Sequence, residues 1–90
     1  MIFEWDEAKA AANLAKHGMS FERAALVFAD PDRLTMADGR HAAETRENTT
    51  GRVADALILT VTHTDRAGVT RLISARPASR QERNRYHAHH

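Results

Sequence analysis

The alternation of apolar and polar positions predicts a short strand and then a helix at the start of the chain. Ile2 to Trp5 alternates apolar and acidic residues as a strand does, and Asp6 has the chemistry of a helix N-cap. Gly18 is the expected left-handed stop of this helix. Small residues with helical spacing form a face that we expect to lie close on a sheet: Ala8, Ala11, Ala12 and Ala15. A polar stripe runs along the same helix: Lys9, Asn13, Lys16 and His17.

A second helix is predicted between Ser20 and Asp30. Ser20 is its N-cap, and Asp30-Pro31 ends it because the residue before a proline disfavours the helical conformation. Its apolar face has the spacing i, i+3, i+4, i+7: Phe21, Ala24, Ala25 and Phe28. We expect this face to pack on the sheet.

Strand-like alternation follows. It predicts strands at residues 33–38 and 56–64, and the second of these is expected at the centre of the sheet. One face of that strand is mainly apolar: Leu57, Leu59, Val61 and His63. Residues 40–52 are polar and have no clear period, and within them residues 44–50 are either a strand or a mobile loop.

A hairpin is predicted next. Residues 65–68 are turn formers that join the central strand to a strand at 69–75, and the two strands should pair antiparallel. The sequence does not fix which residues of these two strands pair with each other. A shift by one residue decides whether His63 shares a face with Arg71.

The chain closes with a helix. Pro77 ends the last strand because it lacks an N–H, and Ser79 and Glu82 have the spacing of a capping box, so the helix starts near Arg80. Residues 87–90 are expected to be a frayed tail. The predicted fold is α+β, with two N-terminal helices packed on a mostly antiparallel sheet and one C-terminal helix.

The residue totals are those of a small globular protein. The 90 residues are 42% hydrophobic and 28% charged, which predicts a single domain over residues 1–90. The net charge of +1 hides an asymmetry, because residues 1–70 carry 8 basic and 11 acidic side chains whereas residues 71–90 carry 5 arginines and one acid. The basic end suits nucleic acid or an acidic protein partner.

Several classes of protein are excluded by what the sequence lacks. It has no cysteine, so neither a disulfide framework nor a thiolate metal site is expected. No apolar run approaches the ~20 residues of a membrane span, and we expect a cytoplasmic protein. No cofactor and no metal site is predicted, and binding of transition metals is expected only adventitiously, at His87, His89 and His90.

A set of short motifs extends in order from Phe3 to Tyr86. The opening Phe3-Glu4-Trp5-Asp6 and the block Ile73-Ser74-Ala75-Arg76 are the most distinctive. Other matching residues are Lys9, Asn13, Lys16-His17-Gly18, Asp30-Pro31, Arg46, Arg80, Glu82-Arg83 and Tyr86. Together they resemble the BrnT family, the toxins of bacterial type II toxin–antitoxin pairs.

The resemblance implies a compact RelE-like fold, a ribonuclease activity that halts translation, and neutralisation by a ribbon-helix-helix antitoxin of the BrnA type. In that family the complex of toxin and antitoxin also represses its own operon. One stretch departs from the family pattern: after Thr45-Arg46, where members usually carry an apolar or aromatic residue, this chain has Glu47-Asn48-Thr49-Thr50. The departure bears on the middle strand and on an RNA-binding role for Arg46.

RNA cleavage without a metal needs a group that helps the 2′-hydroxyl attack its own phosphate, a second that protonates the leaving oxygen, and cations around the phosphorane. Arg76, Arg80 and Arg83 are the predicted cations and are expected to converge on one patch. Tyr86 lies on the same side of the helix and is predicted to stack on a base or to assist catalysis. The plain alternatives are a solvated basic helix, a docking patch for an acidic partner, and a tyrosine packed on the sheet.

Proton transfer is assigned to His17 as a hypothesis, although the dipole at a helix C-terminus favours a histidine there in any case. Lys9 and Lys16 are predicted to bind phosphate or simply to solvate the helix. Arg71 and His63 are predicted RNA contacts, against an ion pair for Arg71 and a structural histidine for His63.

Two functions fit these features. The first is a metal-independent RNA endonuclease, held inactive by an antitoxin that covers the basic end. The second is a non-catalytic module that acts as corepressor in an antitoxin–operator DNA complex. A purely structural partner, with its arginine-rich helix docked on an acidic surface, is the weaker third.

Overall fold

The computed structural model describes residues 1–39, 45–54 and 56–89. Its elements, in chain order, are β1 (Ile2–Glu4), α1 (Glu7–His17), α2 (Phe21–Ala24), the 3-10 helix η1 (Ala25–Ala29), β2 (Leu34–Asp38), β3 (Arg46–Ala54), β4 (Leu57–Arg66), β5 (Val69–Pro77) and α3 (Arg80–Ala88). The predicted α+β class is confirmed. Residues 40–44, which belong to the stretch without a clear period, and His90 of the predicted tail lie outside the described residues.

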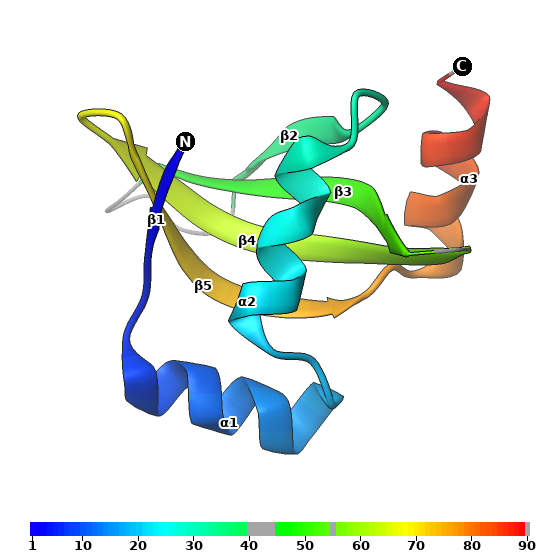
Figure 1. Ribbon diagram of the computed structural model, residues 1–90. Coiled ribbons are helices and arrows are strands. Elements are labelled where there is room, and N and C mark those ends of the chain that lie inside the picture. The colour runs from blue at the N-terminus through cyan, green and yellow to red at the C-terminus, as the bar shows by residue number, and fades with distance from the viewer. Residues whose placement is uncertain (40–44, 55, 90) are drawn as a thin grey trace.

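The strands form a five-stranded sheet in the order β1-β5-β4-β3-β2 (Figure 1). β4 is central, as predicted, and its neighbours β3 and β5 both run antiparallel to it. β1 pairs with β5 in the parallel direction. The sheet is therefore mostly antiparallel, as expected from the sequence. Within the described ranges, no helix has both the length and the apolar character needed to cross a membrane.

Residues 46–54 are a strand, which decides between the two readings of this polar stretch. Threonine hydroxyls hold it to its neighbours on both sides. Thr49 bonds Thr35 of β2 and Thr50 bonds Thr60 of β4, each with an oxygen–oxygen distance of 2.8 Å. Threonine is β-branched and therefore favours a strand, and its hydroxyl can form a hydrogen bond with a residue on the neighbouring strand. These two properties explain why a polar stretch forms a paired strand here.

A bulge sets the register of the β4–β5 hairpin. Thr62 pairs with Ser74, but the next pair is His63 with Leu72, so Ile73 is the extra residue. Thr64 then pairs with Arg71. Paired residues share a face of the sheet and neighbours alternate, so His63 and Arg71 lie on opposite faces.

The main core lies between the sheet and the helical segments α2 and η1. Its fully buried members come from both layers: Met19, Phe21, Ala24, Val27, Leu59, Val61, Leu72 and Ala75. The predicted second helix is in fact a short α-helix followed by a 3-10 turn. η1 packs so closely on β3 that a Cβ at Gly51 would lie 3.0 Å from the carbonyl oxygen of Val27, which explains the glycine.

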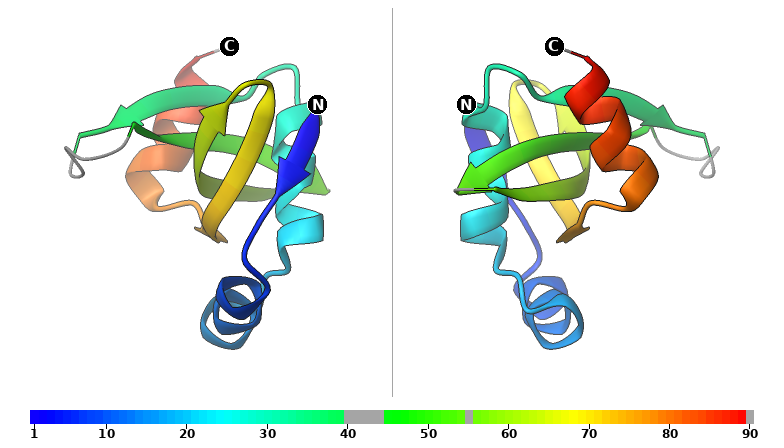
Figure 2. Two further views of the ribbon diagram at one scale, coloured as in Figure 1. Left: turned by 90° about the vertical axis from the view of Figure 1, so that its left-hand side faces the viewer. Right: turned by 90° about the vertical axis from the view of Figure 1, so that its right-hand side faces the viewer.

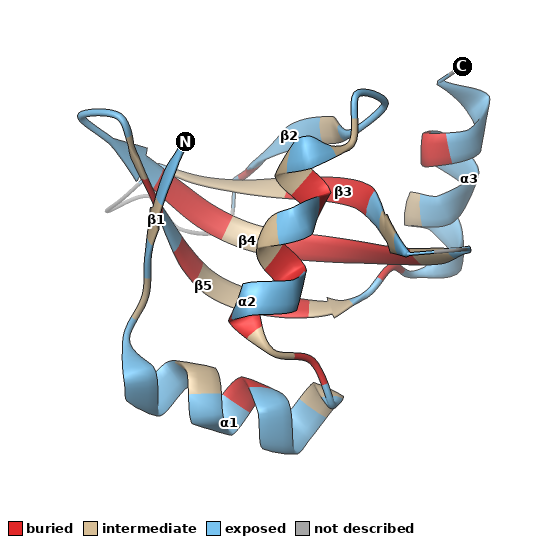
Figure 3. Ribbon diagram, in the orientation of Figure 1, coloured by how far each residue is buried: buried red, intermediate tan, exposed pale blue. Residues whose placement is uncertain are grey.

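The predicted packing of α1 is wrong. All four alanines of the small-residue face are exposed, and Asn13 is buried instead (Figure 3). Figure 1 shows the reason, because α1 lies beyond the edge of β5 rather than flat on a face of the sheet. A helix at the edge of a strand lies beside backbone N–H and C=O groups that have no partner strand. A polar side chain can form hydrogen bonds with these groups, whereas alanine cannot.

Asn13 completes the edge of β5. Its Oδ1 accepts from the Ala75 N–H at 3.0 Å, and its Nδ2 donates to the Ala75 carbonyl at 2.9 Å. The same Nδ2 donates to the Met19 carbonyl at 2.9 Å. Met19 follows Gly18, which has a left-handed conformation and ends the helix as predicted. The amide of Asn13 thus replaces the strand that β1, with three residues, is too short to provide.

α3 packs against the other side of the sheet from α2 (Figure 2). A small apolar cluster joins it to the strands: Ile58, Ala78 and Tyr86. The predicted capping box is confirmed, since the Ser79 hydroxyl accepts from the Glu82 N–H and the Glu82 carboxylate accepts from the Ser79 N–H. The helix continues through Ala88, into the segment that was expected to be a tail.

We expect Asn13→Ala to lower the free energy of unfolding by about 2–4 kcal/mol, because it leaves the buried N–H and carbonyl of Ala75 unpaired. Urea unfolding measures the loss. Lys16→Ala, an exposed change on the same helix, is the control and should stay within ~0.5 kcal/mol of the parent. An Asn13→Ala protein as stable as the control would contradict the edge role of Asn13.

Candidate nucleic-acid interface

One row of side chains crosses the face of the sheet opposite the main core. Glu4 of β1 pairs with Arg71 of β5, and Arg71 pairs with Thr64 of β4. Arg46 continues the row on β3, because the residue after it, Glu47, pairs with His63. Four neighbouring strands therefore present polar or charged side chains at one level.

This row forms the floor of a groove of about 240 Å³, which we call the basic groove. The lining residues are Glu4, Lys9, Arg46, Thr64, Arg66, Val69, Arg71 and Ile73. Four of them are basic and one is acidic, so the groove is suited to a polyanion. It brings together three of the predicted RNA contacts, Lys9, Arg46 and Arg71.

Arg71 already has a partner in the groove. Its Nη1 lies 2.8 Å from Glu4 Oε2, and the two side chains are 45% and 51% exposed respectively. An ion pair so exposed contributes little to stability, since water screens both charges. The predicted ion pair of Arg71 is therefore present, and the guanidinium still faces the groove.

A second hollow continues the groove along α1. It has a volume of about 230 Å³ and shares Lys9 and Ile73 with the basic groove. Its other lining residues include Lys16 and His17, two further members of the predicted polar stripe. The structure thus brings the stripe and the sheet row together, because Asn13 holds α1 beside β5.

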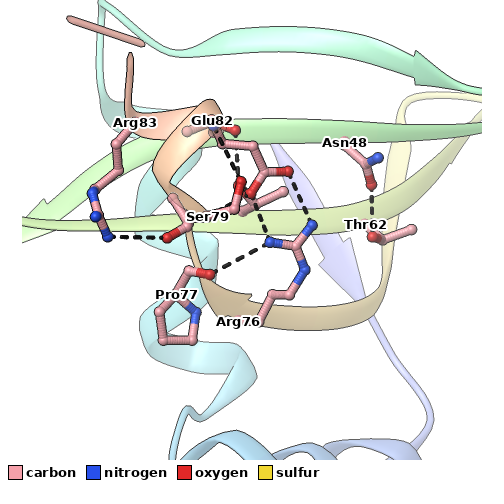
Figure 4. Close-up of polar contacts among 10 residues, drawn as sticks. Asn48, Thr62, Arg76, Pro77, Ser79, Glu82 and Arg83 are labelled. Atoms are coloured by element: carbon pink, nitrogen blue, oxygen red, sulfur yellow. Dashed lines mark hydrogen bonds and ion pairs between the residues drawn. The ribbon is translucent and has the colours of Figure 1, made fainter. Parts of the chain in front are cut away.

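Arg76 is held by Glu82 (Figure 4). Its two terminal nitrogens donate to the two oxygens of Glu82 at 2.6 and 2.9 Å. Glu82 also accepts from the Thr60 hydroxyl and from the Ser79 N–H. The hydrogen bonds from Arg76, aided by those from Ser79 and Thr60, overcome the effect of burial and lower the pKa of Glu82 to about 2.

The predicted convergence of Arg76, Arg80 and Arg83 on one patch is wrong. Arg83 Nη1 donates to the Ala78 carbonyl at 3.2 Å, and Figure 4 shows this side chain on the other side of Ser79 from Arg76. Arg80 is exposed at the first turn of α3. The guanidinium groups of Arg76 and Arg83 therefore have different environments, because Arg76 bonds the carboxylate of Glu82 whereas Arg83 bonds a backbone carbonyl before the helix.

Tyr86 is a structural residue of α3. The residue is 1% exposed, and its hydroxyl donates to Asp30 Oδ2 at 2.5 Å. Burial and the neighbouring carboxylate raise the pKa of this hydroxyl. The same Asp30 oxygen accepts from the Arg52 N–H, so the bond ties α3 to β3 and to the end of η1. The prediction that Tyr86 stacks on a base is therefore wrong.

His63 does not reach the basic groove. It faces the main core at 3% exposure, with its ring edge-on to Phe28 and its Nε2 2.8 Å from the Thr49 hydroxyl. The predicted RNA contact at His63 is wrong because the bulge puts this residue on the opposite face from Arg71. The structural reading of His63 is the correct one.

Three groove residues were not predicted from the sequence: Glu4, Thr64 and Arg66. The alternation of β1 and β4 could have identified them, because it puts Glu4 on the face of β1 opposite to Phe3 and puts Thr64 and Arg66 on one face of β4. No metal site was predicted, yet the described residues contain one group of potential ligands, Glu47, His63 and Asp65.

Comparison with known proteins identifies the family of this chain. The sequence model of the ribonuclease toxin BrnT of type II toxin–antitoxin systems matches residues 5–82. The chain belongs to the BrnT family. It is therefore a ribonuclease toxin of a type II toxin–antitoxin system, as its motifs implied, and such a system pairs each toxin with an antitoxin.

The fold of this BrnT-family chain is also similar to that of a solved structure. The 1.1 Å crystal structure of the Brucella abortus ribonuclease toxin BrnT superposes with a TM-score of 0.65. The alignment covers 89% of this chain and 100% of that one, at 24% sequence identity. No curated protein matches the chain.

The Glu82 network makes the stability of the protein pH-dependent in a defined range. The pKa of Glu82 falls from its ordinary value of 4.5 to about 2 on folding, so the unfolded chain takes up the proton first. Stabilisation by the charged carboxylate is complete above pH 4.5 and is lost as the pH falls toward 2. We expect Glu82→Gln to cost about 2 kcal/mol at pH 7, and this difference from the parent to shrink between pH 4.5 and 2.

Urea unfolding of both proteins at several pH values measures this difference. Glu22→Gln, an exposed change on α2, is the control and should track the parent at every pH. A Glu82→Gln protein whose stability runs parallel to the parent down to pH 2 would show that the network does not hold the charge of Glu82.

Proposed function

We propose that this BrnT-family chain cleaves single-stranded RNA in the basic groove without a metal ion and thereby halts translation. The observation that carries the proposal is the row Glu4, Arg71, Thr64 and Arg46, with Lys9 and Arg66 beside it. Cations positioned around a phosphodiester stabilise the extra negative charge of the phosphorane as it forms. The folded sheet fixes these cations before the substrate binds.

Acid–base chemistry is assigned to groups that line the same groove. Glu4 accepts the proton of the 2′-hydroxyl as this oxygen attacks the adjacent phosphorus. The bond from phosphorus to the 5′-oxygen breaks, and the leaving oxygen takes a proton from the Lys9 ammonium. The products are a 2′,3′-cyclic phosphate and a 5′-hydroxyl. Arg71 orients Glu4 through their ion pair and binds the phosphate.

The second hollow extends the path of the RNA. Lys16 and His17 line it next to Lys9, so they are placed to bind the next phosphate along the strand. Arg80, at the start of α3, is assigned to substrate or partner contacts beyond the groove. Arg76 reaches an RNA phosphate only by leaving Glu82, so we assign it a role in positioning α3 in the free protein.

The fold and the partners follow the family. We propose that the sheet and its helices are the RelE-like arrangement, that the protein acts in the cytoplasm, and that its antitoxin is a ribbon-helix-helix protein of the BrnA type. An acidic segment of that antitoxin would cover the basic groove and exclude RNA. Operator DNA would be contacted only through the antitoxin.

We expect purified protein to cut a single-stranded RNA in the presence of EDTA. Arg66→Ala and Lys9→Ala should each lower the cleavage rate by about 10-fold or more, because each removes a cation from the groove. Glu4→Gln should lower it further, since it removes the proton acceptor. Gel analysis of labelled RNA measures the rates and identifies the cyclic phosphate.

The matched control is Arg23→Ala, an exposed arginine on α2, across the sheet from the groove. It should cleave as fast as the parent. Loss of activity in EDTA by protein that remains folded would contradict the metal-independent mechanism. Full activity of both Arg66→Ala and Lys9→Ala would remove the reaction from the basic groove.

The alternative function is that of a non-catalytic corepressor in the antitoxin–operator complex. Two observations favour it: Arg76 is engaged by Glu82, and Tyr86 is buried. Both residues were predicted to act on RNA, and in the free protein both serve the packing of α3. On this reading the chain changes the affinity of the antitoxin for DNA and leaves RNA intact.

Expression in a bacterial host separates the two functions. We expect the parent chain to arrest growth and co-expression of the cognate antitoxin to restore it. Glu4→Gln, produced at the same level, should be tolerated because it folds but does not cleave. Unimpaired growth with the parent chain, together with tighter operator binding by the antitoxin when the chain is added, would favour the corepressor.

A further inference from the structure

Three potential metal ligands meet on the core side of the sheet, near the β4–β5 turn. Glu47 of β3 pairs with His63 of β4, and Asp65 follows two residues later on the same strand, so the three side chains share one face. One ligand atom from each lies within 4.8 Å of the other two. We call this group the carboxylate–histidine trio.

The imidazole of His63 points an unbonded nitrogen into the trio. The residue is 3% exposed, and its Nδ1 makes no hydrogen bond although it lies 3.3 Å from Asp65 Oδ2. A buried ring nitrogen without a hydrogen bond is uncommon and calls for a partner.

Neighbouring hydroxyls orient two of the three ligands. The second ring nitrogen of His63, Nε2, lies 2.8 Å from the Thr49 hydroxyl, which in turn bonds Thr35. The Thr70 hydroxyl donates to Asp65 Oδ1 and leaves Oδ2 directed at His63. Protein metal sites are built in this way, with the far nitrogen of a ligating histidine and the outer oxygen of a ligating carboxylate both bonded.

The two carboxyl groups of the trio compete for a positive charge. One carboxylate oxygen of Glu47 and one of Asp65 lie within 4.8 Å of each other, so the two negative charges repel when both groups are ionised. A divalent cation between them would neutralise both charges.

We propose that Glu47, His63 and Asp65 bind a divalent first-row metal ion of the Zn²⁺ or Mn²⁺ type. One imidazole nitrogen and two carboxylate oxygens suit these ions better than Ca²⁺ or Mg²⁺, which prefer oxygen ligands alone. Bonds of about 2.0–2.2 Å draw ligand atoms to roughly 3–3.5 Å from one another, which rotations of the two carboxylates supply. The Asp65 side chain is 47% exposed, so water reaches the site and completes the coordination.

The metal site and the basic groove lie on opposite faces of the same strands. Thr64 faces the groove, whereas His63 and Asp65 on either side of it face the trio. A bound ion would fasten β3 to the end of the hairpin that carries Arg66 and Arg71. Its role is therefore structural, and the proposal does not depend on the cleavage mechanism.

Calorimetric titration of the full chain with Zn²⁺ alone, and with Mn²⁺ alone, tests the proposal. The histidine tail is removed as a competing ligand by substituting His87→Ala, His89→Ala and His90→Ala in every protein used. We expect this background protein to bind one equivalent of at least one of the two ions, and its melting temperature to rise when the ion is in excess. Asp65→Asn and Glu47→Gln should each weaken binding by at least 10-fold.

Glu22→Gln, at an exposed acidic position on α2, is the matched control and should bind as the background does. If Asp65→Asn fails to fold, Glu47→Gln decides the outcome, and Thr70→Val provides a further test because it loosens Asp65 without removing a ligand. Absence of binding in the background protein would overturn the proposal. Binding that survives both Asp65→Asn and Glu47→Gln unchanged would also overturn it.

Discussion

The arrangement of this protein depends on one side-chain amide at the edge of a sheet. β1 pairs with only the first part of β5, so beyond Arg71 the edge of β5 that faces away from β4 has no described strand beside it. Asn13 bonds both the N–H and the carbonyl of Ala75 and so continues the ladder with a helix. α1 is thereby fixed beside β5, where Lys9 borders the basic groove and Lys16 and His17 border the hollow next to it. The position of every cation on α1 follows from this contact.

The β4–β5 bulge separates two kinds of chemistry on the same two strands. Thr64 and Arg71 pair on the face of the groove, and His63 and Leu72 pair on the face of the core. In a regular hairpin without the bulge, the register would continue unchanged along both strands, and His63 would share a face with Arg71. The bulge therefore keeps a buried imidazole away from the basic groove. Glu82 has a comparable effect at the other end of β5. It belongs to the capping box of α3 and also accepts hydrogen bonds from Arg76, so it holds that guanidinium at the start of the helix.

Local signals in the sequence predicted local structure well. The capping box of Ser79 and Glu82, the stop at Gly18 and the central strand are decided by neighbours in the chain, and all three are confirmed. The order of elements and the BrnT family were also predicted from the sequence. The prediction that the small-residue face of α1 packs on the sheet was wrong. Helical spacing identifies one face of a helix, but it does not tell whether that face lies against the sheet, beside its edge or in solvent.

The composition of the site was less predictable, because it depends on which strands become neighbours. Helical spacing placed Arg83 and Tyr86 on one side of a helix, but Arg83 bonds the Ala78 carbonyl whereas the Tyr86 hydroxyl bonds Asp30. Glu4 and Arg46 lie far apart in the sequence and reach one groove only through β5 and β4. No spacing in the sequence encodes that row.

RNA cleavage in the basic groove requires that its cations bind the RNA backbone. This binding is measured through the salt dependence of the affinity for a 2′-O-methyl RNA, which cannot be cleaved by attack of the 2′-hydroxyl. We expect the slope of log affinity against log salt to become shallower by about 0.7 in Arg66→Ala and by the same amount in Lys9→Ala, and to stay at the parent value in Arg23→Ala. Equal slopes in all four proteins would contradict RNA binding by these cations.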